Sequence, residues 1–457
     1  MTERFHPDEV LMRAPLRLIP ALLLLFGFFP TTAFAWGEHT LASYPALGAL
    51  PEIANAAPVR IESLEQFLSA EEQSLVTVLA EEEQWARANV PNYPERPAAL
   101  AFEATGNALD LRERFVRAIR INPNSRLLSY TQRVPRDDRP GCQRIPASRI
   151  TFLRNIMYLS SVTFCEYQPG QSIPALDVVA SGADEPDYGL DIGLFEDGET
   201  EFGKQYGFGA QPFGNPALEF SSQAPFHMGF FHESWIVYQL APFLGRTFPE
   251  YRAHLYMTLA RHAFATGHDY WGYRFMGWGL HYVQDLTQPY HATVLPGVSV
   301  FKMLWINFLN VIGFGTGQKR AVQLVSNRHL ALEDFQKRIM KQSYVSGNLD
   351  YPIFAALEDT STDSGYGTYN DRYLRDVITV ESTDRATELD ETLSEAMPEQ
   401  FVQDPEFNFD SNDNPDALID AIAQGQLQTE QKMAEPLGVL FRSFGAHSRN
   451  YARAVLE

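Results

Sequence analysis

The feature that most constrains this chain is a long region of helical periodicity between residues 228 and 291. Apolar residues recur there three or four positions apart, the spacing that places side chains on one face of an α-helix. These residues are Phe230, Trp235, Val237, Leu240, Leu255, Leu259, Ala263, Phe275, Trp278 and Tyr282. Turn residues at 245–247 and 267–268 divide the region, so it predicts at least three long helices.

The rest of the chain also favours helices over strands. We expect helices over 36–50, 60–93, 320–343 and 428–454, with a kink or break at Pro436 in the last, and short helical pieces such as 148–160. Residues 181–226 are rich in Gly, Pro and Phe and predict loops, and the acidic, proline-broken residues 383–416 predict a surface excursion. Almost no segment alternates as a strand would. We therefore predict an all-α, multi-helix fold with long loops.

The first 35 residues have the pattern of a cleavable export signal. Arg13 and Arg17 precede a short apolar run over 18–29, and Ala33-Phe34-Ala35 supplies the small residues that signal peptidase needs. The run is too short for a membrane-spanning helix, which needs about 20 residues. An uncleaved anchor is the alternative, and Met12 is a second possible start. Cleavage after Ala35 predicts a secreted or periplasmic chain that begins at Trp36.

The charge of the chain argues against one class of partner. The formal net charge is −21, and it stays at −21 after cleavage because residues 1–35 hold three basic and three acidic residues. Such a chain lacks the basic surface of a nucleic-acid binder. An anionic substrate is still compatible with it, because bound metal ions can reverse the local charge.

Cys142 and Cys165 are the only two cysteines of the chain. An even pair in an exported protein predicts one disulfide. Two buried free thiols are the alternative, since spacing alone does not show proximity.

The strongest candidate for chemistry is the stretch from His281 to His291. His281 and Asp285 are four residues apart and share one face of a helix, and Pro289 should end that helix so that His291 can turn back. Imidazole and carboxylate are ligands that zinc accepts. For one such pair, a simple hydrogen bond is the more common role.

Two further elements favour a metal site. His329 and Glu333 form a second pair with helical spacing, and several such pairs in one helical protein suggest a multi-metal site. Cleavage would also release the α-amino group of Trp36 three residues before His39, and a deprotonated amine can bind a metal. The alternative is that a cleavage site merely precedes a tryptophan.

In these residues the chain resembles the secreted bacterial zinc-dependent phospholipase C family, and it is more distantly similar to the single-strand-specific zinc nucleases. The shared pattern is a mature N-terminal Trp, a nearby His, a loop Asp, a lone His, the His-Tyr-x-x-Asp-x-x-x-Pro-x-His stretch and a final His-x-x-x-Glu pair. It covers about half of the mature chain, which we predict to be a single domain over 36–457 with insertions at about 60–175 and 383–425.

The resemblance implies three zinc ions per chain. Trp36, His39 and a shared Asp285 would hold the first ion. The second would take Asp184, His227, His281 and Asp285, and the third would take His291, His329 and Glu333.

Two of these assignments have neighbours that could replace them. Asp187 is the alternative to Asp184, which we select because an Ala-Asp pair resembles the family pattern. His232 is the alternative to His227. His39 also lies closer to the terminal Trp than is usual in the family. We expect the other histidines, His254, His262, His268 and His447, to be structural.

The resemblance implies hydrolysis of phosphatidylcholine-type phospholipids to diacylglycerol and a phosphorylated head group, by water that the zinc ions activate. Asp184 would orient that water or accept its proton. The final His-x-x-x-Glu pair, which ends at Glu333, resembles the lipase branch, whereas the nuclease branch resembles a His-x-x-x-Asp pair. The strongly apolar residues 294–314 would then contact a membrane surface, or else form a buried helix.

Two other functions remain as alternatives: a zinc nuclease or phosphodiesterase of the same fold, and an inactive, zinc-stabilised binding protein. We see no obligate protein partner in the sequence. Residues 410–416 hint at a calcium loop, but they lack the Gly and the distal Glu of a strong motif, so a solvated loop is the simpler interpretation.

Overall fold

The computed structural model describes residues 36–457 except 300–315, 410–413, 415 and 426–427. The leader, most of the apolar stretch 294–314 and most of the loop 410–416 therefore lie outside the described residues. The described part is mostly helical, which confirms the predicted helical class. Within it, no helix is long and apolar enough to cross a membrane.

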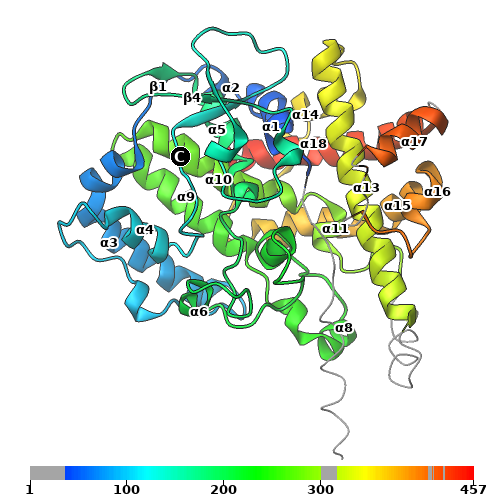
Figure 1. Ribbon diagram of the computed structural model, residues 1–457, viewed down its shortest axis with the longest axis horizontal. Helices are drawn as coiled ribbons and strands as arrows, with labels where there is room; N and C mark the ends of the chain where they lie inside the picture. The colour runs from blue at the N-terminus through cyan, green and yellow to red at the C-terminus, as the bar shows by residue number, and fades with distance from the viewer. Residues whose placement is uncertain (1–35, 300–315, 410–413, 415, 426–427) are drawn as a thin grey trace, which may run out of the picture.

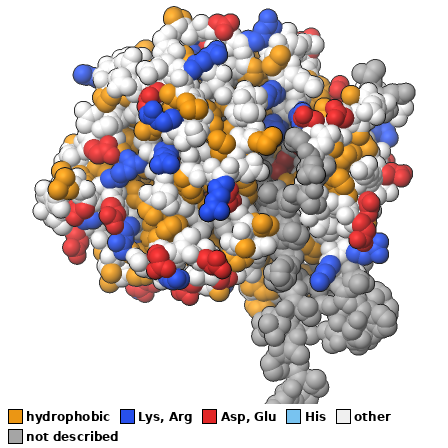
Figure 2. Space-filling view, in the orientation of Figure 1, with side chains coloured by type: hydrophobic (Ala, Val, Ile, Leu, Met, Phe, Trp, Pro, Cys, Tyr) orange, Lys and Arg blue, Asp and Glu red, His pale blue; other side chains and the backbone are white. Residues whose placement is uncertain are grey.

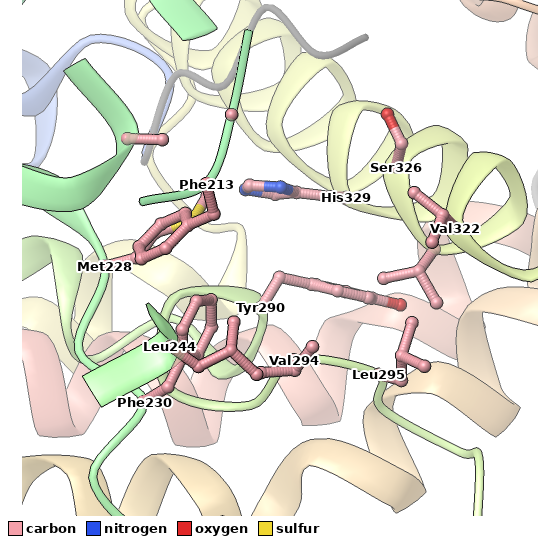
Figure 3. Close-up of a pocket in the computed structure, with 13 residues that line it drawn as sticks. Phe213, Met228, Phe230, Leu244, Tyr290, Val294, Leu295, Val322, Ser326 and His329 are labelled. Atoms are coloured by element: carbon pink, nitrogen blue, oxygen red, sulfur yellow. The ribbon is translucent and has the colours of Figure 1, made fainter. Parts of the chain in front are cut away.

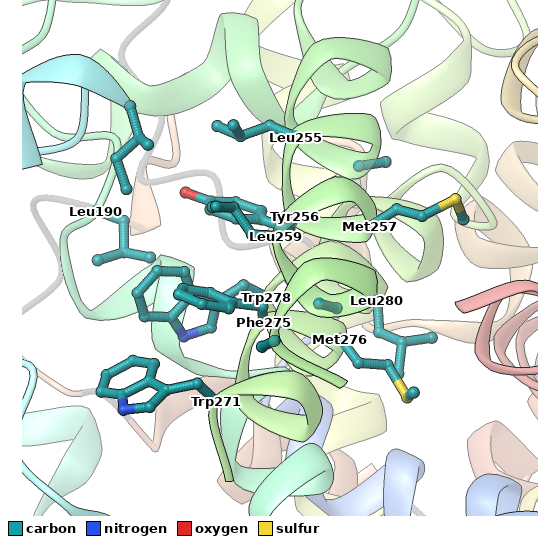
Figure 4. Close-up of a cluster of buried hydrophobic side chains, with 14 of the residues drawn as sticks. Leu190, Leu255, Tyr256, Met257, Leu259, Trp271, Phe275, Met276, Trp278 and Leu280 are labelled. Carbon is teal, nitrogen blue, oxygen red and sulfur yellow. The ribbon is translucent and has the colours of Figure 1, made fainter. Parts of the chain in front are cut away.

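Helix α10 (Asp269–Asp285) is the centre of the molecule, and almost all of its residues are buried. It packs along α9 (Pro249–Ala265) and also contacts α5 (Ala175–Gly182) and α18 (Gln428–Leu456) (Figure 1). Aromatic and aliphatic side chains fill the space beside α9 and α10, with Tyr256, Trp271, Phe275 and Trp278 among the largest (Figure 4). Burial of these large apolar surfaces is the main force that holds α10 in place.

A second, separate hydrophobic core includes the first described residues of the chain. It joins Trp36 and α1 (His39–Gly48) to α13 (Thr316–Ser346), α14 (Pro352–Glu358), α15 (Thr379–Ala396) and α18. The remaining helices are α2 (Pro51–Ala54), α3 (Leu64–Asn89), α4 (Leu111–Ala118), α6 (Gly203–Tyr206), α7 (Ala224–His227), α8 (Trp235–Leu240), α11 (Pro289–Ala292), α16 (Glu399–Val402) and α17 (Ala417–Gly425).

Two small antiparallel sheets accompany these helices, where the sequence had indicated almost no strand. One pairs β1 (Val59–Arg60) with β5 (Ser172–Ile173), and the other has the order β2 (Tyr130–Arg133), β4 (Thr163–Glu166), β3 (Gln143–Ile145). Cys142, just before β3, and Cys165 of β4 form a disulfide with a Cα–Cα distance of 4.9 Å. The predicted disulfide is therefore confirmed.

Local sequence explains several helix ends. Ser63 caps α3, because its hydroxyl accepts the amide of Gln66 while the Gln66 side chain accepts the amide of Ser63. As expected, Pro289 follows the end of α10 and opens the short helix α11. Helix α18 continues through Pro436.

Three predictions about local structure were wrong. Residues 228–248 hold only the six-residue helix α8 and a short 3-10 turn, because one proline and two glycines interrupt the apolar spacing there. The segment 148–160 holds two 3-10 turns and no α-helix. Residues 383–416 are not a surface excursion, since Leu389 and Leu393 of α15 are buried in the second core.

The face shown in Figure 2 has basic and acidic side chains interspersed among apolar ones. The net charge of −21 is therefore not gathered into one acidic patch on this face.

Candidate metal centre

Three groups of buried His, Asp and Glu side chains meet beside the C-terminal end of α10. In each group the candidate ligand atoms all lie within 4.8 Å of one another. The groups are His39, His281 and Asp285; Asp187, His227 and His281; and His291, His329 and Glu333. Residues from six separate segments of the chain thus converge on one region.

The first group is oriented by a glutamine of α10. His39 Nδ1 lies 2.8 Å from Gln284 Oε1. The Gln284 amide donates to Ser43 and Ser448, which fixes its oxygen toward His39. His39 must then donate from Nδ1, so Nε2 presents a lone pair 3.2 Å from Asp285 Oδ1.

The second group shares His281 and Asp285 with the first. His281 donates from Nδ1 to Ala183 O at 2.7 Å, so its Nε2 lone pair points at His227 Nδ1, 2.9 Å away. His227 Nδ1 also lies 2.9 Å from Asp285 Oδ2 and 4.0 Å from Asp187 Oδ1. The two carboxylate oxygens of Asp285 therefore face different groups, as a bridging ligand requires.

The third group lies where α11 meets α13. His291 donates from Nδ1 to His227 O, and its Nε2 is 3.1 Å from His329 Nε2. Glu333 Oε1 is 2.6 Å from His329 Nε2 and accepts the amide of Gln288 at 2.9 Å. The ring of Tyr290 stacks on His329, with centroids 5.4 Å apart.

A close contact between two helices positions the loop carboxylates. A Cβ on Gly277 of α10 would lie 2.5 Å from Val179 O and 2.8 Å from the Cα of Gly182, so only glycine permits this approach of α5. The turn that follows α5 is tied to α10 through Glu185, which accepts from Arg274 and from Trp278 Nε1. Asp187 is thereby held at the cluster.

Trp36 is buried beside the same end of α10. Its indole Nε1 donates to Gln284 O and Thr287 Oγ1, both at 3.0 Å, and its ring packs on Phe441. A Cβ on the next residue, Gly37, would lie 3.1 Å from Glu333 O. The segment before His39 is thus placed between α10 and α13, next to the first and third groups.

The structure separates both pairs of alternative residues. Asp187 belongs to the second group, whereas Asp184, which the sequence analysis selected, lies outside the three groups and accepts the backbone amide of Thr40 at 3.1 Å. His227 belongs to the cluster, and His232 instead contacts Arg375 O at 2.8 Å.

The histidines that we expected to be structural pair with carboxylates outside the three groups. The pairs are His254–Glu82, His262–Glu71, His268–Glu62 and His447–Glu381. From the loop 410–416, Asp416 is described, and it forms an ion pair with Arg338.

The electrostatics of the centre favour a bound cation. Burial raises the pKa of Asp187 to about 7 and holds the pKa of Glu333 well above its usual value. Burial also lowers the pKa of His291 to about 4, whereas hydrogen bonds to Asp191 and Asp285 raise the pKa of His227 to about 10. Buried carboxylates and neutral imidazoles are stabilised together when a metal ion supplies the positive charge.

In the first group, His39 Nε2 and Asp285 Oδ1 face each other at 3.2 Å, and neither atom has another hydrogen-bond partner among the described residues. Together with the nitrogen and oxygen donors of all three groups, this fits zinc, which binds both. The buried groups could therefore hold a metal ion, as the sequence predicted.

Some residues of the centre were not identified from the sequence. Gln284 lies inside the His281–Asp285 stretch, so its helical face could have indicated a supporting role. Asp191 Oδ2 lies 3.4 Å from His227 Nε2, and the same carboxylate pairs with Arg252 and accepts from Tyr282. Asp191 therefore supports His227 through Nε2, while Nδ1 of the same ring faces the second group. No local sequence pattern around Asp191 predicts this contact.

Two cavities adjoin the centre. An acidic cavity, whose roughly 880 Å³ of empty space includes open solvent, is bordered by Asp187 and Glu333 and also by Glu38, Asp184, Lys337, Tyr158 and Tyr188. An apolar cavity, whose roughly 550 Å³ of empty space includes open solvent, has His329 in its lining, and the neighbouring Leu330 borders the acidic cavity. In Figure 3 the rings of His329 and Tyr290 lie parallel, with Met228 and Phe213 across from them.

No family model, no curated protein and no solved structure matches the chain. Its function must therefore be inferred from the residues of the centre and its two cavities.

Proposed function

We propose that this protein is a secreted, zinc-dependent phosphodiester hydrolase of the phospholipase C type, with phosphatidylcholine-like lipids as substrates. The observation that carries the proposal is the shared carboxylate of Asp285, which lies between His39 and His227 and so joins two of the three groups. Metal ions held close together suit a phosphodiester, because they activate water and stabilise charge on the phosphoryl oxygens.

The acidic cavity supports a cationic head group. Glu38 borders it with a buried carboxylate oxygen, Oε1, that has no partner among the described residues. Tyr158 and Tyr188 also border it. Carboxylates beside aromatic rings are the usual environment for a quaternary ammonium ion. The head group would occupy this cavity while the phosphate faces the three groups.

Asp184 borders the same cavity and gives the chain a proton acceptor beside the centre. Its Oδ2 accepts the amide of Thr40, which orients the carboxyl group. Burial raises its pKa, as expected for a carboxylate that takes up a proton during hydrolysis. Its proposed role is therefore to accept a proton from the attacking water rather than to hold a metal.

The test is a parallel assay of the mature protein on phosphatidylcholine vesicles and on single-stranded DNA, with metal analysis of the same sample. We expect about three zinc ions per chain, release of phosphocholine, loss of release with a chelator and recovery when zinc is returned. Cleavage of DNA without cleavage of lipid would assign the protein to the nuclease branch. Full zinc content with neither activity would identify a zinc-stabilised binding protein.

A further inference from the structure

Helix α8 and the turn after it present an unusual surface. Residues 235–245 contain no charged side chain. Trp235 has 73% of its surface exposed, the second most exposed large apolar side chain among the described residues. Pro242 is also exposed, and Ile236, Tyr238 and Phe243 are half-buried. Apolar side chains gathered in one partly exposed, charge-free segment are typical of sites that contact a protein or a membrane.

The exposure of Trp235 does not come from a loosely attached segment. Ser234 caps α8 by accepting the amide of Val237. Val237, Ala241 and Leu244 are buried in one cluster with Phe213, Ala224, Met228 and Phe230, and the Tyr238 hydroxyl donates to Phe230 O. The inner face of the segment is therefore fixed to the protein, and the outer face is left to contact something else.

The cluster that anchors α8 also forms the wall of the apolar cavity. Phe230 and Leu244 belong to both, and Val322 and Val325 of α13 line the other side (Figure 3). The cavity reaches His329, a member of the third group. The apolar cavity thus lies between the cluster that anchors α8 and a residue of the candidate metal centre.

We infer that α8 and residues 241–245 form a surface that contacts a zwitterionic phospholipid bilayer, and that the apolar cavity receives an aliphatic part of the lipid. This inference rests on the proposed function and names the element that brings the enzyme to its substrate. Trp and Tyr prefer the membrane interface, where an apolar ring and a polar tip are both accommodated.

The charge pattern selects the kind of bilayer. A surface for anionic lipids would carry Lys or Arg, and residues 235–245 have none. The net charge of −21 would also oppose approach to an anionic surface. Zwitterionic head groups carry no net charge, so binding to them needs no Lys or Arg on the surface and is not opposed by the net negative charge of the protein.

The experiment compares the zinc-loaded wild-type protein with Trp235→Ala. Sedimentation with vesicles of a phosphonate analogue of phosphatidylcholine, which resists cleavage at the glycerol side, measures binding without turnover. We expect the vesicle partition coefficient to fall by about tenfold, as the loss of one large aromatic side chain from the interface predicts. Hydrolysis of a soluble, short-chain phosphocholine ester should be unchanged, because the three groups are untouched.

Leu109→Ala is the matched control, since Leu109 is 97% exposed and precedes α4, which lies across the molecule from α8 (Figure 1). It should leave vesicle binding unchanged. Equal binding by wild type and Trp235→Ala would overturn the inference even if phosphatidylcholine is cleaved. Binding that depends on Trp235 without any cleavage would uphold this surface while refuting the proposed function. A wild-type dimer that Trp235→Ala converts to a monomer, without vesicle binding, would show that a second copy covers α8 and would also overturn it.

Discussion

Gln284 offers the sharpest test of the metal centre, because it touches His39 without being a candidate ligand. Its oxygen accepts from His39 Nδ1 at 2.8 Å, and its amide donates to Ser43 and Ser448. Gln284→Met keeps the length of the side chain and removes both functions. His39 then loses the contact that fixes its tautomer, so its Nε2 is no longer held toward Asp285.

The magnitude follows from the role of such supporting hydrogen bonds. Loss of one typically lowers metal affinity by about 10- to 100-fold, or roughly 1.4–2.7 kcal/mol. Gln284→Glu keeps an acceptor for His39 and should retain most of the affinity. Only the ion held with His39 should be affected, because the third group contacts Gln288 and not Gln284.

Competition with a graded series of zinc chelators measures this effect, with zinc content determined at each step. We expect one of three ions to leave Gln284→Met more readily than wild type, and Gln284→Glu to resemble wild type. Thermal unfolding in excess chelator controls for damage to the apoprotein. If Gln284→Met holds all three ions as tightly as wild type, or if both variants lose one equally, the assigned geometry of His39 is wrong.

Three further predictions test the site and its support. Asp285→Asn should reduce zinc from about three ions to about one and lower activity by at least about 100-fold, since it removes the carboxylate shared by two groups; full zinc content by metal analysis would contradict the bridge. One additional residue before Trp36 should strongly reduce activity until it is removed, because it displaces the α-amine by about 3.5 Å; equal activity in the two forms would make Trp36 a packing residue only. Gly277→Ala should lower the free energy of unfolding by about 2–3 kcal/mol in denaturant titrations, since its Cβ would meet backbone atoms of α5, whereas Gly365→Ala, where a Cβ has no neighbour within 4 Å, should change it little.

Local periodicity was sufficient to predict the parts of the centre that a single helix determines. His281 and Asp285, like His329 and Glu333, are four residues apart, and helical geometry alone brings each pair together. The structure places both pairs on helices, α10 and α13, and within the candidate groups. Such contacts depend on few residues and so can be read from the sequence.

The choice between Asp184 and Asp187 could not be made in this way. Both lie in one short turn, and its orientation is set by Glu185, which is bound to Arg274 and Trp278, 89 and 93 residues later in the chain. That long-range contact turns Asp187 toward His227 and leaves Asp184 with Thr40. Composition was similarly misleading for α15, where many acidic residues surround the buried Leu389 and Leu393.

The end of α10 concentrates several functions on one helical face. His281, Gln284 and Asp285 are three or four residues apart, so they project together, and each has a different role: candidate ligand, orienting partner and shared carboxylate. Gln284 O and Thr287 also bind the indole of Trp36. The position of Trp36 and the geometry of the candidate ligands therefore depend on the same two turns of chain. A substitution that shifts this helix end should therefore disturb metal binding and the packing of Trp36 together.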